Sequence, residues 1–120
     1  MTIHILKLNA KYYEDVRKKN KTFEVRYNDR GFKVGDRLIL REISDSGEYS
    51  GRLLQRKVSY MLTHEEFPQG LKDGYAVLAL VNDCVFTGEE ADELRREGAK
   101  IGIVDMWRAI IDGRVKPDDL

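Results

Sequence analysis

The chain has 120 residues and a mass of 13.9 kDa, which suits one domain with a short extension. A content of 42% hydrophobic and 35% charged residues excludes a disordered chain, and the longest apolar run, residues 75–81, is too short to cross a bilayer. The single Cys84 excludes an internal disulfide, and residues 1–8 lack a signal segment, so we expect a cytoplasmic protein. His4 and His64 lack the spacing of metal ligands, so we expect neither a metal nor a cofactor.

The net charge of zero hides an uneven distribution along the chain. Residues 7–41 contain eleven Lys/Arg and five Asp/Glu, a net charge of +6, whereas residues 83–120 contain six and ten, a net charge of −4. A basic first part is typical of a protein that binds a polyanion. Ordinary charged helix and strand surfaces explain the same distribution equally well.

The first two predicted elements are a strand and a helix. Residues 2–9 alternate weakly between apolar and polar and predict a strand. Residues 10–19 predict a short helix, because Tyr12, Tyr13 and Val16 fall at helical spacing and the last turn is basic, as the negative end of the helix dipole favours. We expect Asn20 to end this helix in a left-handed conformation, which Asn tolerates.

Residues 22–28 alternate with the period of two that predicts a strand. Three apolar side chains share the face that we expect to be buried: Phe23, Val25 and Tyr27. Four polar side chains share the face that we expect to meet solvent: Thr22, Glu24, Arg26 and Asn28. We interpret this polar row, with Lys21 at its start, as a candidate binding face. An exposed ladder of salt bridges is the alternative interpretation.

Three more strands follow, at residues 37–43, 52–62 and 75–81, separated by turn-rich segments. In the second of them, the alternate side chains of one shared face are Leu54, Arg56, Val58, Tyr60 and Leu62. The third is almost continuously apolar, which predicts a strand buried on both sides.

The last part of the chain has helical character. A capping-box pattern at Thr87 opens a predicted helix that ends at Gly98, and residues 101–112 predict a second helix. The second helix carries an apolar stripe made of Ile103, Met106, Trp107, Ile110 and Ile111. We therefore predict an α+β fold, a small mixed or antiparallel β-barrel over residues 1–82 with a helix after its first strand, and a C-terminal two-helix extension over residues 83–120 that packs on the barrel or at a subunit contact.

The side chains that begin the second predicted strand offer two kinds of chemistry. A lysine in a cleft acts as a base beside a carboxylate, which makes Lys21, Glu24 and Thr22 the candidate catalytic residues of an enzyme. Lys and Arg also bind phosphate, and a Glu accepts hydrogen bonds from the amine of a base. On that alternative, the candidate ligand-binding residues are Lys21, Thr22, Glu24, Arg26, Asn28, Arg30 and Tyr49, where Arg30 extends a positive rim and Tyr49 stacks on a base.

Two segments resemble the ASCH domain of the PUA-like superfamily: NKTFEVR at residues 20–26 and FKVGD at residues 32–36. The family pattern is Gly-x-Lys-x-x-Glu-x-Arg followed by Gly-Asp before a strand, and Lys21, Glu24, Arg26, Gly35 and Asp36 match it, with Asn20 near the glycine position. KDGY at residues 72–75 is similar to a small bacterial and phage branch of unassigned function. The resemblance covers residues 3–81.

The resemblance implies a PUA-like β-barrel whose cleft, beside the first helix, binds RNA or a nucleotide-like ligand. Another branch of the family hydrolyses an acetylated cytidine with a Lys, a Thr and a Glu, and its Thr stands three residues after the Lys. Here Glu24 occupies that position and the nearby hydroxyl is that of Thr22. The resemblance therefore supports a binding function more strongly than a hydrolytic one. A third hypothesis is a phage or bacterial accessory factor that binds a protein partner, or forms a homodimer, through the apolar stripe of the C-terminal helices.

Overall fold

The computed structural model describes residues 2–82, 92 and 96. The chain divides into two compact units, residues 1–83 and 84–120. Cys84 and the helices expected at residues 87–98 and 101–112 lie outside the described residues. In the first unit the elements follow one another as β1 (Ile3–Asn9), α1 (Ala10–Arg17), β2 (Phe23–Tyr27), β3 (Arg37–Ile43), β4 (Tyr49–Thr63) and β5 (Tyr75–Val81).

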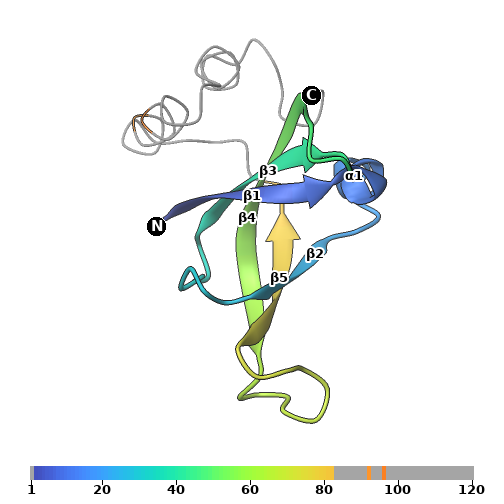
Figure 1. The fold of residues 1–120 in the computed structure, drawn as a ribbon. Coiled ribbons are helices and arrows are strands. Elements are labelled where there is room, and N and C mark those ends of the chain that lie inside the picture. The colour runs from blue at the N-terminus through green and yellow to red at the C-terminus, as the bar shows by residue number, and fades with distance from the viewer. Residues whose placement is uncertain (1, 83–91, 93–95, 97–120) are drawn as a thin grey trace. The chain divides into compact units, whose positions relative to one another are not determined.

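The five strands form one sheet in the order β1-β3-β4-β5-β2. β1 is parallel to β3, and the other neighbours are antiparallel. The long β4 pairs with β3 through its first half and with β5 through its second half (Figure 1). β1 and β2, which come first in the sequence, are therefore the two edges of the sheet.

The predicted α+β fold with a small barrel and a two-helix extension is wrong. Strand makes up 49% of the described residues and helix 12%, and the sheet is a five-strand curled half-barrel with one helix. That helix, α1, does follow β1 in the chain. β4 begins at Tyr49 and runs for 15 residues, so it is longer than the strand predicted at residues 52–62 and forms hydrogen bonds with both β3 and β5.

An irregularity in β4 changes which of its side chains face the core. The register with β5 shifts between Val58 and Tyr60, which is the position of a β-bulge. Leu54, Arg56 and Val58 are buried as the alternation predicts, but Tyr60 after the shift is 58% exposed. The predicted shared face therefore ends at Val58, since one inserted residue moves the following side chains to the other side of the sheet.

α1 begins and ends with recognisable caps. The Asn9 side chain accepts a hydrogen bond from the backbone N–H of Lys11 at 3.0 Å. At the other end, Lys19 N–H donates to Val16 O at 3.1 Å and Asn20 N–H donates to Asp15 O at 2.9 Å, the paired bonds of a Schellman motif. The left-handed residue is Lys19, with φ of 66°, so the expectation that Asn20 takes this conformation is wrong.

The core fills the concave side of the half-barrel. Tyr13 and Val16 of α1 are buried together with leucines of four strands: Leu6, Leu8, Leu38, Leu40, Leu54, Leu78 and Leu80. α1 is also tied to β3 and β4 by charge, since the Arg52 guanidinium lies 4.1 Å from the centre of the Tyr13 ring and donates to Glu42 and Glu14. Burial raises the pKa of the Tyr13 hydroxyl to about 12, so this residue is neutral at physiological pH.

Candidate functional site

The two edge strands come together at a pocket, which we call the seam pocket. It has a volume of about 520 Å³. Its lining residues come from β1, α1, the segment between α1 and β2, and β2: Lys7, Leu8, Asn9, Tyr12, Lys21, Phe23, Glu24, Val25 and Arg26. The Arg26 guanidinium bridges the two edges, since its Nη2 donates to the Lys7 carbonyl at 2.7 Å. The pocket therefore lies where a half-barrel leaves its edges unpaired with each other.

A buried carboxylate is the central polar group of the seam pocket. Glu24 is 5% exposed, and each of its oxygens accepts from a different cation: Oε1 from Lys21 Nζ at 2.9 Å and Oε2 from Arg26 Nε at 3.0 Å. A buried carboxylate is costly without such partners. The side chains of Lys21 and Arg26 keep 20% and 25% of their surface exposed. The cluster thus has a buried negative centre and two cations that reach solvent.

The predicted assignment of the two faces of this strand is reversed. Glu24 pairs across the sheet with Leu78 and Arg26 pairs with Ala76, both of which are core residues. Paired residues point to the same side of a sheet, so the polar row faces inward. Phe23, Val25 and Tyr27 face outward and are 45%, 49% and 57% exposed. The expected complete burial of β5 is wrong for the same reason, because Tyr75 and Val81 share this exposed face.

Aromatic rings stand beside the cations of the seam pocket. Lys21 Nζ lies 5.3 Å from the centre of the Tyr12 ring and 4.9 Å from that of Phe23, and it also donates to the Phe23 carbonyl at 2.8 Å. Tyr12 is exposed on α1, so its ring is accessible at the pocket. The seam pocket therefore combines ring faces, a carboxylate acceptor and cationic donors within a few ångströms.

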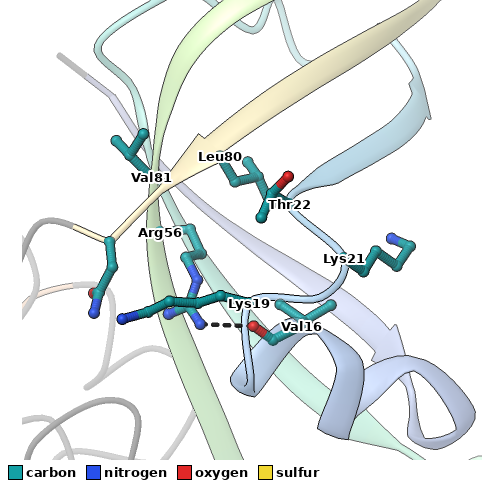
Figure 2. A pocket seen from close by; sticks show the side chains of 8 residues that line it. Val16, Lys19, Lys21, Thr22, Arg56, Leu80 and Val81 are labelled. Carbon is teal, nitrogen blue, oxygen red and sulfur yellow. Dashed lines mark hydrogen bonds between the residues drawn. The ribbon is translucent and has the colours of Figure 1, made fainter.

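The structure brings Lys21, Glu24 and Arg26 together but places the other candidate residues elsewhere. Thr22 lines a second pocket of about 310 Å³ (Figure 2). Asn28 is part of a turn, where its Oδ1 accepts from the Phe32 N–H at 2.8 Å.

The remaining two candidates line neither of these pockets. Arg30 is exposed. The Tyr49 ring is covered by the Arg41 guanidinium, whose carbon lies 3.8 Å from the ring centre.

The sequence interpretation missed a buried polar pair at the start of the sheet. His4 is 6% exposed, and its Nε2 lies 2.8 Å from Oδ2 of Asp36. Burial by itself would raise the pKa of the Asp36 carboxyl, but bonds from His4 and from the N–H groups of Thr2 and Lys33 outweigh burial and lower it. The feature of the sequence that could have pointed to this pair was Asp36 in the Gly35-Asp36 turn before β3. Their separation of 32 positions in the sequence hid their pairing.

Taken together, the fold and the pocket define a small β-rich half-barrel domain with a charged, aromatic-lined site at its open seam. The model of one protein family, described as Domain of unknown function (DUF3850), matches residues 3–80. The chain therefore belongs to this family. The matched range includes all the described residues that line the seam pocket.

No curated protein matches the chain. Within the part of the chain that the structure describes, no helix is long and apolar enough to cross a membrane. In the same residues, no three His, Cys, Asp or Glu side chains are grouped closely enough to hold a metal ion.

Proposed function

We propose that this protein binds RNA or a nucleotide-like ligand and that the seam pocket receives the base. The observation that carries the proposal is the buried Glu24 carboxylate, held between Lys21 and Arg26 beside the rings of Tyr12 and Phe23. A nucleobase has an apolar face and an edge of donors and acceptors. Aromatic rings recognise the face, and fixed polar groups recognise the edge.

The polar groups of the pocket suit a base that carries an exocyclic amine. A carboxylate has about four acceptor positions, and the two cations use two of them, so Glu24 retains capacity to accept from an amine. Carboxylates accept from the amino group of cytosine in this way. Lys21 and Arg26 supply donors for a carbonyl or ring nitrogen. The resemblance of residues 20–26 to the ASCH pattern of the PUA-like superfamily supports the same conclusion, and we place this activity in the cytoplasm.

Hydrolysis of a modified nucleoside is less well supported. A Thr nucleophile would need to stand with both Lys21 and Glu24, whereas Thr22 lines the second pocket, which it shares with Lys21 but not with Glu24. The Lys21 ammonium also donates to two protein acceptors, Glu24 Oε1 and Phe23 O, so it would have to leave both before acting as a base. Binding therefore ranks before catalysis.

The test is a titration of the ¹⁵N-labelled full chain with the four nucleosides, their 5′-monophosphates and a short RNA, followed by NMR. We expect the largest shifts at Tyr12, Lys21, Phe23 and Glu24, and preference for cytosine or adenine over uracil. Arg26→Gln should weaken binding about tenfold, as expected for a lost charged hydrogen bond. Arg30→Gln is the matched control, because it removes the same charge from an exposed residue outside the pocket.

Two results would contradict the proposal. One is the absence of shifts at the seam pocket with every ligand. The other is an equal loss of binding in Arg26→Gln and Arg30→Gln, which would indicate general charge attraction and no defined site. Formation of a hydrolysis product that needs Lys21 would establish the enzymatic alternative.

A further inference from the structure

The outward side of the sheet carries a continuous apolar surface, which we call the outer aromatic face. It extends over β2, β5 and the second half of β4, and its residues are Phe23, Val25, Tyr27, Tyr60, Leu62, Tyr75, Val77 and Ala79. Strand pairing places them in three rows across the sheet: Phe23 with Ala79 and Tyr60, Val25 with Val77 and Leu62, and Tyr27 with Tyr75. None of these eight side chains carries a charge. An apolar surface that spans three strands is a candidate binding surface.

The exposed side chains of this face are mainly aromatic. Half of its residues are Phe or Tyr, and all four of these are exposed. Packing against the core does not account for the rings, because the core contains the alternate residues of β5, which are Ala76, Leu78 and Leu80. Accessible aromatic rings are the groups on which the bases of single-stranded RNA stack, and RNA-binding sheets hold two or three bases in this way.

Tyr27 and Tyr75 have fixed positions on the outer aromatic face. Their ring centroids are 5.4 Å apart and their planes make an angle of 69°, which is an edge-to-face contact. The Tyr27 ring also lies against Gly74, where a Cβ would clash with it. Gly74 therefore leaves the space that the ring occupies. Rings whose positions are fixed before binding lose little conformational freedom when a base stacks on them.

The outer aromatic face begins at the seam pocket. Phe23 and Val25 belong to the face and also line the pocket, where Lys21 Nζ lies 4.9 Å from the centre of the Phe23 ring. Tyr27 stands four residues after Phe23 on the same strand, which places it about 13 Å further along β2 at the usual rise of about 3.3 Å per residue. The Tyr27 ring is therefore beyond the base in the pocket and within reach of a neighbouring nucleotide.

We propose that the seam pocket and the outer aromatic face together bind single-stranded RNA, and that a base next to the one in the pocket stacks on Tyr27. This inference rests on the proposed function and extends it from one base to a strand. Tyr27 is the more exposed ring of the Tyr27–Tyr75 pair, so it offers the larger stacking surface. RNA is favoured over an apolar protein segment because the face continues from a pocket whose cations, Lys21 and Arg26, reach solvent.

The experiment compares ligands that differ in the bases beside a cytidine. The ¹⁵N-labelled full chain is titrated with cytidine 5′-monophosphate, with the trinucleotide UpCpU, and with the same trinucleotide carrying abasic sites in place of both uridines. The two trinucleotides have the same phosphates, so the ratio of their affinities measures contacts of the flanking bases. We expect UpCpU to bind about tenfold more tightly than its abasic form, the gain typical of one stacked base, at both low and high salt. The ring protons of Tyr27 should shift upfield with UpCpU only.

Replacement of Tyr27 tests whether its ring is the stacking surface. Tyr27→Leu should remove most of the tenfold ratio and should weaken binding of UpCpU much more than binding of cytidine 5′-monophosphate. Tyr27→Phe keeps the ring and should keep the ratio. Tyr49→Leu is the matched control, because it removes an exposed tyrosine of β4 that lies outside the outer aromatic face. Circular dichroism of each variant verifies that the comparison is made between folded proteins.

The outcomes separate this inference from the proposed function. Equal affinity for UpCpU and its abasic form, with normal binding of cytidine 5′-monophosphate, would overturn the inference and leave the proposed function intact. Upfield shifts of Tyr27 with UpCpU, without shifts at Glu24, would refute the seam pocket as a base site while supporting the stacking surface. Shifts of Tyr27 that depend on protein concentration and not on RNA would show that a second copy of the chain covers the face, and would overturn the inference. Loss of the ratio in Tyr49→Leu as well would do the same.

Discussion

Removal of the Glu24 carboxylate tests whether the charged cluster of the seam pocket serves stability or binding. Glu24→Ala leaves Lys21 and Arg26 facing each other without the acceptor that each now contacts at about 3 Å. Breaking a fully buried ion pair from one side costs about 3–5 kcal/mol. Both cations here keep a fifth or more of their side-chain surface exposed and can turn to water. We therefore expect about half of that cost, ~2 kcal/mol.

The measurements are urea denaturation and thermal denaturation of the full chain, each followed by circular dichroism. A loss of ~2 kcal/mol in a domain of this size lowers the melting temperature by roughly 8–16 °C. Glu24→Gln keeps the side-chain volume and one acceptor oxygen, so we expect a smaller loss of ~1 kcal/mol. The carboxylate of Glu48, in the exposed β3–β4 turn, supplies the matched control Glu48→Ala, which should change stability by less than about 0.5 kcal/mol.

A triple replacement gives the decisive comparison. Exchanging Lys21, Glu24 and Arg26 for Met, Leu and Met removes all three charges at similar volume. Such replacements of buried charge clusters are often neutral or stabilising. We expect the triple variant to be at least as stable as the natural chain and to lose nucleotide binding. A triple variant that unfolds, or one that still binds, would refute the argument that the cluster is kept for its ligand.

Two further predictions concern stability away from the pocket. The hydrogen bonds that lower the pKa of Asp36 stabilise the fold above the pKa of an unfolded Asp, about 3.9, and this contribution is lost as pH falls through the folded value. Asp36→Asn should therefore flatten the pH dependence of urea denaturation below pH 4, whereas the exposed Asp29→Asn should not; identical profiles for the two variants would contradict the role of Asp36. Gly74 has φ of 82° and a Cβ there would clash with the Tyr27 ring, so Gly74→Ala should lower the free energy of unfolding by about 1–3 kcal/mol. If the loss persists at full size in Gly74→Ala combined with Tyr27→Ala, backbone strain and not the ring is its cause.

The agreement between the predicted and the observed limits differs from element to element. The start of the helix and the limits of β3 and β5 followed from periodicity and turn residues, which are local properties. The prediction for β4 was too short because the first residues of this strand are rich in Ser and Gly, which are typical of turns. The pairing of Tyr49 with Ile43 extends the strand into these residues. The end of α1 was predicted two residues late, at residue 19 instead of Arg17. The left-handed residue was predicted one residue late because Asn tolerates positive φ better than Lys, whereas the hydrogen bonds of the Schellman motif select Lys19.

What the sequence determined by itself is the content of the site: the alternation of β2 and the short spacing among Lys21, Glu24 and Arg26. Only the tertiary structure decided which way that alternation faces. The register of β2 with β5 places Glu24 opposite Leu78 and turns the polar row toward the core, and a shift of one residue would turn it to solvent. The pairing of His4 with Asp36, and the meeting of both edge strands at one pocket, depend on contacts between residues far apart in the chain. Local patterns carry no information about such contacts, because many chain paths are compatible with the same alternation.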